Sequence, residues 1–311
     1  MGSARPLVSV VMPVLNAEAF LGAAIESILA QSMSDLELIV IDDGSDDSSC
    51  GVARAFERHD RRVRFAALDR DPATMSGARA SNVGLDLARG EFIARMDADD
   101  IAPETRLTDQ LATLREGNLD VCGGQVERFG ERDGEVWFPC AHDALANELV
   151  FRAAFPLPTL LARAEVMKRA RFSETEAYEE YALQTRLVAE ARLGNAPEVV
   201  LRIRFHPGQT TRVLHPVKAK SHLRSRFRYF FGRFPDATLD DFRCVDALPR
   251  GARLATHPDL ERAASWLVRL SRLPDARLRQ RMARRWTEAC DLADAPAALR
   301  ADYESRILAA P

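Results

Sequence analysis

The chain has 311 residues, of which 47% are hydrophobic and 29% are charged, and its formal net charge is -3. This length suits one large domain or two ordinary ones, and the near-balanced charge excludes a general attraction to nucleic acid or to an anionic membrane. The five cysteines form no C-x-x-C pair, which argues against a disulfide framework or a zinc ribbon and favours a reducing compartment.

The first hundred residues alternate between short apolar strands and amphipathic helices. Strands are predicted at 7–14, 36–41, 62–68 and 91–96, and helices at 17–31 and 76–88. Such alternation predicts βαβ units with a mostly parallel sheet, and near-continuous apolar strands are typical of burial on both faces. The predicted fold class is therefore α/β.

The pattern is less regular after about residue 119. Segment 119–130 indicates a strand that is interrupted by its glycines. Segment 176–194 indicates a helix that ends at Gly194, and segment 198–206 indicates another strand. After residue 215 the chain is rich in arginine, and apolar residues recur at helical spacing in two runs, Leu260, Ala264, Leu267, Leu270 and Leu278, Met282, Trp286, Ala289. We predict an α/β domain over 1–215 and a mainly helical subdomain over 216–311.

Ligands of open parallel sheets bind at the carboxyl ends of the strands, so the residues that follow each strand are candidate site residues. Asn16 follows the first strand and is suited to capping the next helix, which explains it without a ligand. Asp42 and Asp43 follow the second strand directly. Capping and a tight turn at Gly44 explain part of this segment, and carboxylates there can also accept hydrogen bonds from a base or from ribose hydroxyls.

Three carboxylates lie within four positions after the fourth strand: Asp97, Asp99 and Asp100. Crowded like charges repel, and burial makes them more costly. Two carboxylates at i and i+2 beyond a strand can converge on a divalent cation, since hard cations prefer oxygen ligands. The other interpretation is a solvated acidic turn that caps the next helix, and a D-x-D pattern alone does not separate the two.

Four stretches, taken together, closely resemble the family 2 glycosyltransferases. They are "VSVVMPVLNAEAFLGAAIESILAQS", "LELIVIDDGSDDSS", "ASNVGLDLARGEFIARMDADD" and "APETRL", in this order. The resemblance is strong over about residues 7–110 and looser to about 215. It implies a GT-A fold and an inverting, metal-dependent hexosyl- or N-acetylhexosaminyltransferase of bacterial surface polysaccharide or glycoconjugate synthesis. The donor would be a nucleotide sugar, most often a UDP-sugar for this kind of pocket. The acceptor would be a saccharide or a lipid-linked saccharide. The alternative is a non-catalytic sugar-nucleotide-binding protein.

The resemblance also implies a nucleotide pocket on the donor side. Its residues would be Pro13, Leu15, Asn16, Asp42, Asp43, Arg79, Asn82 and Asp97. Asp43 matches the base contact better than Asp42. Many family members have an arginine where this chain has Ser81, and Arg79 stands two residues earlier.

The metal and diphosphate positions follow from the same resemblance. Asp99 would bind Mn²⁺ or Mg²⁺ directly, Asp97 would share metal and ribose, and Asp100 would support them. His206 would complete the metal shell or touch the diphosphate, which Arg212 would neutralise. A histidine at the end of a strand is also often structural.

On the acceptor side, "EEYALQTRL" at 179–187 resembles the acidic pair that precedes a helix in many members. Glu180 stands at the place of the catalytic base, with Glu179 beside it. The chain departs from the pattern because Glu replaces Asp, Ala182 stands where a second acid is common, and Leu157 stands where a histidine is frequent. A helix dipole would keep a carboxylate in the first turn ionised, although an acidic first turn is also common in ordinary helices.

A basic stretch follows the α/β pattern. Between Val199 and Pro235 there is no carboxylate but nine Lys or Arg, and 218–234 interleaves them with Phe227, Tyr229, Phe230, Phe231 and Phe234. Such a helix can lie on an anionic membrane. We prefer a helix that packs its aromatics on the core, because membrane-surface helices need an uninterrupted apolar face. No apolar run reaches the about 20 residues of a spanning helix, so the expected location is cytoplasmic, with peripheral contact at the inner face of the membrane through 218–234 as the alternative.

Overall fold

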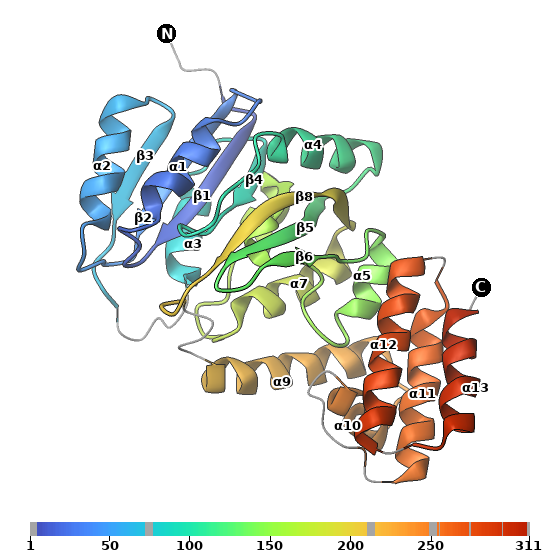
Figure 1. The fold of residues 1–311 in the computed structure, drawn as a ribbon. Coiled ribbons are helices and arrows are strands. Elements are labelled where there is room, and N and C mark those ends of the chain that lie inside the picture. Colours follow the sequence, from blue (N-terminus) through green and yellow to red (C-terminus); the bar gives the residue numbers. More distant parts are fainter. Residues whose placement is uncertain are drawn as a thin grey trace. The chain divides into compact units, whose positions relative to one another are not determined.

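The structure is a computed structural model that describes residues 5–71, 77–209, 215–248, 254, 256–273, 275–293 and 295–309 (Figure 1). The strands are β1 (Val8–Val14), β2 (Leu36–Asp42), β3 (Val63–Ala67), β4 (Phe92–Arg95), β5 (Val121–Gly130), β6 (Gly134–Val136), β7 (Leu161–Arg163) and β8 (Leu193–Phe205). The helices are α1 (Leu21–Leu29), α2 (Ser49–His59), α3 (Ala78–Leu87), α4 (Arg106–Glu116), α5 (His142–Glu148), the short 3₁₀ helix η1 (Leu157–Thr159), α6 (Ala164–Ala170), α7 (Glu179–Glu190), α9 (His215–Arg233), α10 (Leu239–Ala247), α11 (His257–Ser271), α12 (Ala276–Ala293) and α13 (Ala297–Leu308).

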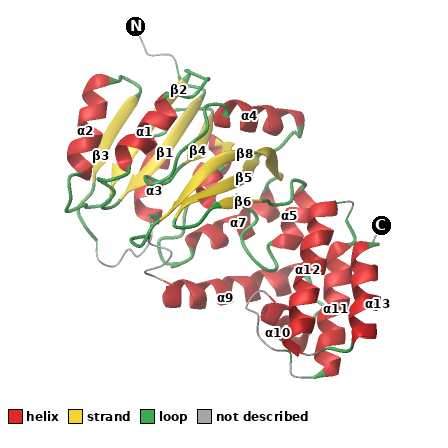
Figure 2. Ribbon diagram, in the orientation of Figure 1, coloured by secondary structure: helices red, strands yellow, loops and turns green. Residues whose placement is uncertain are grey.

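The chain divides into two compact units. The first comprises residues 1–140 and 155–222 and holds the sheet, whereas the second comprises 141–154 and 223–311 and is helical (Figure 2). The second unit thus includes α5 from the middle of the chain. The sequence analysis did not separate this segment from the α/β domain. Whether 1–215 and 216–311 act as separate domains stays a prediction. Within the described ranges, no helix combines the length and the low polarity that a bilayer span requires.

The first unit is built on one eight-stranded sheet in the order β3-β2-β1-β4-β7-β5-β6, with β8 also paired to β5. The pairs among β1, β2, β3 and β4 are all parallel, as predicted, while β7 runs antiparallel to both neighbours. Every residue of β1, β2 and β4 is buried. In the register of the sheet, Val14 of β1 lies opposite Asp42, and Val11 lies opposite Arg95. The residues that follow β2 and β4 therefore emerge at the same edge.

Helices cover both faces of this sheet. The helix predicted over 17–31 is α1, and its apolar residues Leu21, Ala24, Ile25 and Ile28 join one core cluster with Val10 and Met12 of β1. α3 packs on the opposite face, where Val11 points. There a Cβ added at Gly84 would lie 2.3 Å from Val11 Cγ1, so this glycine permits the close approach of helix and strand.

Two local predictions were wrong, and both errors have a tertiary cause. α7 ends at Glu190, and Gly194 lies inside β8 rather than at a helix end. A Cβ there would lie 2.4 Å from Leu119 Cδ1, so tight packing against the neighbouring loop explains this glycine. α1 begins at Leu21 with Phe20 at its N-cap, and Asn16 has a φ of 51° and does not cap this helix.

The second unit confirms the predicted helical stripes. Both apolar runs, on α11 and α12, are buried and share one core with aromatic residues of α9 and α10. Phe230 of α9 and Phe234, the residue after this helix, lie 5.1 and 4.9 Å from the ring of Trp266, measured between ring centroids.

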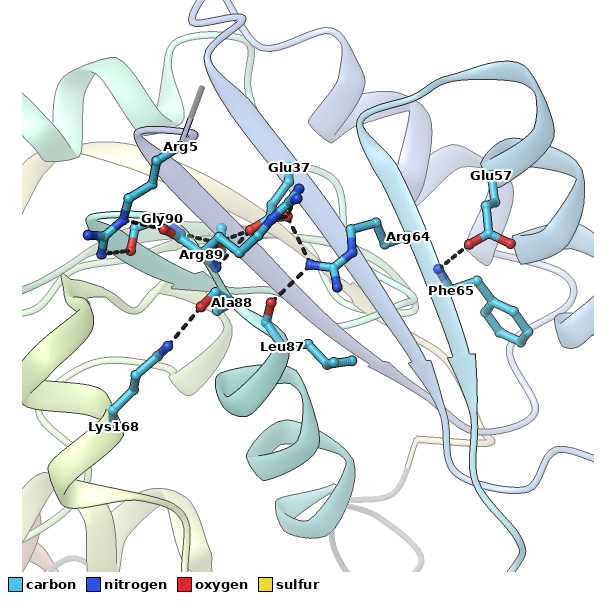
Figure 3. A network of polar contacts seen from close by, with 11 residues as sticks. Arg5, Glu37, Glu57, Arg64, Phe65, Leu87, Ala88, Arg89, Gly90 and Lys168 are labelled. Carbon is cyan, nitrogen blue, oxygen red and sulfur yellow. Dashed lines mark hydrogen bonds and ion pairs between the residues drawn. The ribbon is translucent and has the colours of Figure 1, made fainter. Parts of the chain in front are cut away.

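A buried carboxylate organises the amino ends of β1 and β2, at the edge opposite the predicted ligand edge. Glu37 accepts hydrogen bonds from Ser9 Oγ at 2.6 Å, Arg89 Nη2 at 2.7 Å and Arg64 Nη1 at 3.1 Å. Figure 3 shows both arginines converging on it, with Lys168 reaching the same loop before β4. Burial raises the pKa of Glu37, but the hydrogen bonds from Ser9, Arg89 and Arg64 outweigh it and lower the pKa. The network holds the entry to β4 in place.

We expect Glu37→Gln to lower the free energy of unfolding by about 2 kcal/mol at pH 7, because two arginines lose their carboxylate partner. The folded-state pKa lies below the usual 4.5, so this contribution is present above that pH and is lost as the pH falls further. Urea unfolding at pH 7 and near pH 4 measures it. The control is Glu57→Gln, whose carboxylate accepts only the exposed Phe65 N–H among the described contacts (Figure 3). Equal losses in both variants would contradict the prediction.

Candidate active site

The acidic turn after β4 brings three carboxylates together. Asp97, Asp99 and Asp100 each offer an oxygen, and these atoms lie within 4.8 Å of one another. Asp100 is buried and the other two are half-buried. Ile101, next in the chain, exchanges backbone hydrogen bonds of 3.0 and 2.8 Å with Arg202 of β8. The acidic turn is therefore held between β4 and β8, which is the last strand of the sheet along the chain.

The end of β8 supplies the polar partners of this turn. Arg204 donates its backbone N–H to Asp100 Oδ1 at 2.9 Å and its Nε–H to the Asp99 carbonyl at 2.9 Å. His206 Nε2 lies 3.0 Å from Asp99 Oδ2, although the two residues are 107 apart in sequence. The His206 ring also packs on Phe20, at 4.7 Å between centroids. The structure thus brings His206 to the acidic turn.

The carboxylates of this turn repel one another, and burial adds to the cost of their charge. Burial first, and then the charge of Asp97, raises the pKa of Asp99 despite its hydrogen bond with His206. Burial and the charges of Asp97 and Asp99 raise the pKa of Asp100 well above its usual value. A divalent cation would relieve this repulsion, and carboxylate oxygens with one imidazole are ligands that Mn²⁺ accepts. The donor set therefore fits a hard divalent cation.

Sequence reasoning missed two arginines that lie close to the acidic turn. Arg95 is buried at the end of β4, and its Nη1 pairs with Asp97 Oδ1. Residues 95 and 97 share one side of an extended chain, which was the available signal. Arg106 of α4 is fully buried and donates from Nη2 to the carbonyls of Arg95 and Pro158 at 2.8 and 2.7 Å. Burial lowers the pKa of Arg106 to about 10, so it is still cationic at neutral pH.

The loops after β1 and β2 are joined to each other. Asn16 donates its backbone N–H to Ser45 Oγ at 2.9 Å and accepts the Asp46 N–H on Oδ1 at 3.0 Å. Asp42 accepts the N–H groups of Gly44 and Ser45 at 3.2 and 3.0 Å, in a turn where Gly44 has a φ of 82°. Asp42 is therefore committed to its own turn. Pro13 is buried within β1 and Leu15 is exposed beside the loop.

Asp43 differs from its neighbour Asp42. It is buried, its backbone N–H bonds the Val14 carbonyl at 2.9 Å, and no described residue hydrogen-bonds its Oδ1. Arg79 Nη1 lies 3.6 Å from that oxygen, which is an ion pair without hydrogen-bond geometry. Burial raises the pKa of Asp43, and the charge of Arg79 opposes the shift. Asp43 thus offers an acceptor for a ligand donor at the edge where β1 and β2 end.

Asn82 has a structural task in α3. Its Oδ1 accepts the Phe172 N–H at 2.9 Å, and its Nδ2 donates to the Phe172 carbonyl at 3.0 Å and to Glu174 Oε1 at 2.7 Å. These bonds hold the loop that precedes α7. A nucleotide contact by Asn82 stays a prediction.

Glu180 lies in the first turn of α7, as expected. Its Oε1 accepts the Leu157 N–H at 2.8 Å, at the start of η1. The same short helix ends beside β4, where Arg95 donates its N–H to the Leu160 carbonyl at 2.9 Å. η1 thus connects Glu180 to the strand that leads into the acidic turn. Glu179 is buried next to it, and Arg212 lies outside the described residues. The catalytic roles of these residues stay predictions.

The fold is that of the GT-A glycosyltransferases. A crystal structure of S. aureus TarS in complex with UDP-GlcNAc is similar with a TM-score of 0.59 and 16% identity, over 96% of this chain and 91% of that one. The mannosyltransferase PcManGT from Pyrobaculum calidifontis, in complex with GDP-Man and Mn²⁺, is similar with a TM-score of 0.57 and 16% identity, over 99% and 86%. At such identities the likeness concerns the fold alone.

The sequence comparisons define the family. The model of glycosyl transferase family 2 matches residues 9–160. The glycosyltransferase GlyG of Streptococcus pneumoniae is 31% identical over 196 residues, which are 58% of this chain and 64% of GlyG. An uncharacterized glycosyltransferase of Haemophilus influenzae is 32% identical over 178 residues, 57% of this chain and 70% of that protein. The chain belongs to glycosyl transferase family 2.

We expect Asn82→Ala to lower the free energy of unfolding by about 2 kcal/mol, because buried backbone groups of Phe172 lose their partners. Chemical denaturation measures this loss. Asp86→Asn on the same helix is the control, since it weakens only an exposed ion pair with Arg171 and should cost less than about 1 kcal/mol. If Asn82→Ala were as stable as the wild type and bound nucleotide sugars more weakly, the structural role would be wrong.

Proposed function

We propose that the chain is an inverting, metal-dependent glycosyltransferase that moves a hexosyl or N-acetylhexosaminyl group from a nucleotide sugar to an acceptor hydroxyl. The observation that carries this proposal is the acidic turn of Asp97, Asp99 and Asp100 joined to His206. A UDP-sugar is the proposed donor, which the UDP-GlcNAc complex of TarS supports as a fold-level analogy. The proposed acceptor is a saccharide or lipid-linked saccharide of a bacterial surface polysaccharide.

The acidic turn is the proposed metal and diphosphate site. Asp99 and His206 would hold Mn²⁺ or Mg²⁺, with Asp97 shared between metal and ribose. Such a cation, when bound, stabilises the negative charge of a departing nucleoside diphosphate. Arg95 pairs with Asp97, and the Arg204 N–H holds Asp100 in the turn. The PcManGT complex with Mn²⁺ is consistent with this choice of metal.

The edge after β1 and β2 is the proposed nucleoside site. Asp43 would accept a hydrogen bond from the base, because its Oδ1 is buried and lacks a described hydrogen-bond donor. Arg79 lies beside it and would balance its charge. Leu15 and the Asn16 loop would form the neighbouring wall, whose shape depends on the hydrogen bonds to Ser45 and Asp46.

Glu180 is the proposed base. Its Oε1 accepts the Leu157 N–H, and it lies in the first turn of α7. Glu180 would take the proton of the acceptor hydroxyl, whose oxygen forms a bond to the anomeric carbon while the bond to the diphosphate oxygen breaks. Attack from the face opposite the leaving group inverts the configuration at that carbon.

We expect Glu180→Gln to reduce sugar transfer by about 10² to 10⁴-fold, because the amide cannot accept the proton, while donor binding changes little. A panel of nucleotide sugars, with and without Mn²⁺, first identifies the donor by release of nucleoside diphosphate. Transfer and calorimetric donor binding are then compared with those of Glu190→Gln, an exposed position at the other end of α7. Unchanged transfer would remove Glu180 from the mechanism. Donor binding without release from any sugar, in the presence of candidate acceptors, would favour a non-catalytic binder.

A further inference from the structure

Helices α9 and α10 carry an exposed apolar patch in the second unit. Leu223, Phe227 and Leu239 are 37%, 43% and 49% exposed. Phe227 lies 4.7 Å from Phe231 and 5.1 Å from Phe242, between ring centroids. Phe242 is three residues after Leu239 on α10, which places both on one side of that helix. We call Leu223, Phe227 and Leu239 the α9–α10 patch.

The patch is separate from the part of α9 that forms the core. Phe230 and Phe234 are buried against Trp266, and Tyr229 donates its hydroxyl to the Ala146 carbonyl at 2.7 Å. Leu223 and Phe227 are four residues apart on another face of the helix. The expectation that the aromatics of 218–234 pack on a core is met by Tyr229, Phe230, Phe231 and Phe234, which lie in or against the core of the second unit, but not by the exposed Phe227. Packing in this core therefore does not account for Phe227.

Positive charge borders the patch. The sequence of α9 contains six Lys or Arg and no Asp or Glu. Arg224 and Arg228 are exposed and alternate with Leu223 and Phe227 along one side of the helix. The acids nearby on α10 are paired within the unit: Asp240 with Arg243 at 3.2 Å, and Asp241 with Arg262 at 3.0 Å. Asp236, before α10, pairs with Arg269 at 3.7 Å. The charge that α9 presents is thus positive.

We propose that the α9–α10 patch lies on the anionic surface of a lipid bilayer. Leucine and phenylalanine side chains would enter the boundary between headgroups and acyl chains, while Arg224 and Arg228 would contact lipid phosphates. A second copy of the chain suits this face less well, because a two-fold contact would set arginines against arginines. The surface would keep the protein at the bilayer and does not depend on the identity of the sugar donor.

Vesicle co-sedimentation of the full chain tests this proposal. We expect binding to phosphatidylcholine vesicles that contain about a third phosphatidylglycerol, weakened by salt, and little binding to phosphatidylcholine alone. The double variant Arg224→Glu/Arg228→Glu should bind at least tenfold more weakly. Leu223→Ser/Phe227→Ser should lose binding to a similar extent, with circular dichroism to check that it folds.

Matched controls lie on the same unit. Leu292→Ser/Leu308→Ser changes leucines that are 44% and 46% exposed on α12 and α13, and Arg284→Glu/Arg306→Glu changes exposed arginines of those helices. Both should bind vesicles as the wild type does. The proposal is overturned if the wild type does not bind anionic vesicles, if the controls lose as much binding, or if neutral vesicles bind equally well. Loss of a dimer in the patch variants, without any vesicle binding by the wild type, would assign the patch to a second copy instead.

Discussion

The candidate site is built around an arrangement that costs electrostatic free energy. Oxygen atoms of three carboxylates lie within 4.8 Å of one another at the end of a buried strand. Burial and mutual repulsion raise the pKa of Asp99 and Asp100, so the turn needs positive charge to persist. The fold supplies part of this positive charge from three elements: Arg95 at the end of β4, Arg106 on α4, and Arg204 at the end of β8. These groups compensate only part of the negative charge of the three carboxylates. The remaining negative charge is the basis for expecting a divalent cation at this turn.

The sheet explains why this turn and the β2 loop can serve one ligand. Parallel pairing of β1 with β2 and β4 delivers both loops to the same edge, which is the edge where ligands of parallel sheets bind. At the opposite edge, Glu37 holds Ser9, Arg64 and Arg89 together and orders the entry to β4 (Figure 3). The carboxylate at this edge is thus hydrogen-bonded within the protein, while Asp43 Oδ1 at the ligand edge has no described hydrogen-bond donor.

Sequence reasoning predicted what depends on local pattern. The periodicity of apolar residues predicted the parallel strands, the helix α1 and the buried faces of α11 and α12. It failed where a residue serves a distant contact: Gly194 permits packing against Leu119, and Asn82 binds the Phe172 backbone, 90 positions away. The meeting of His206 with Asp99 was expected only from the family resemblance, because spacing along the chain carries no information about a contact across 107 residues. Arg95 was missed because a charged residue inside a buried strand contradicts the apolar pattern used to find strands.

The central claim is that the acidic turn binds a divalent cation together with a nucleoside diphosphate. Electron paramagnetic resonance of Mn²⁺, titrated into the protein with UDP present, measures this when the same titration of UDP alone is subtracted, because bound Mn²⁺ loses its free-ion signal. We expect one Mn²⁺ per chain for the wild type and for Asp35→Asn, an exposed aspartate before β2, and at least tenfold weaker binding for Asp99→Asn. Equal binding by wild type and Asp99→Asn, or no Mn²⁺ bound by either, would contradict it.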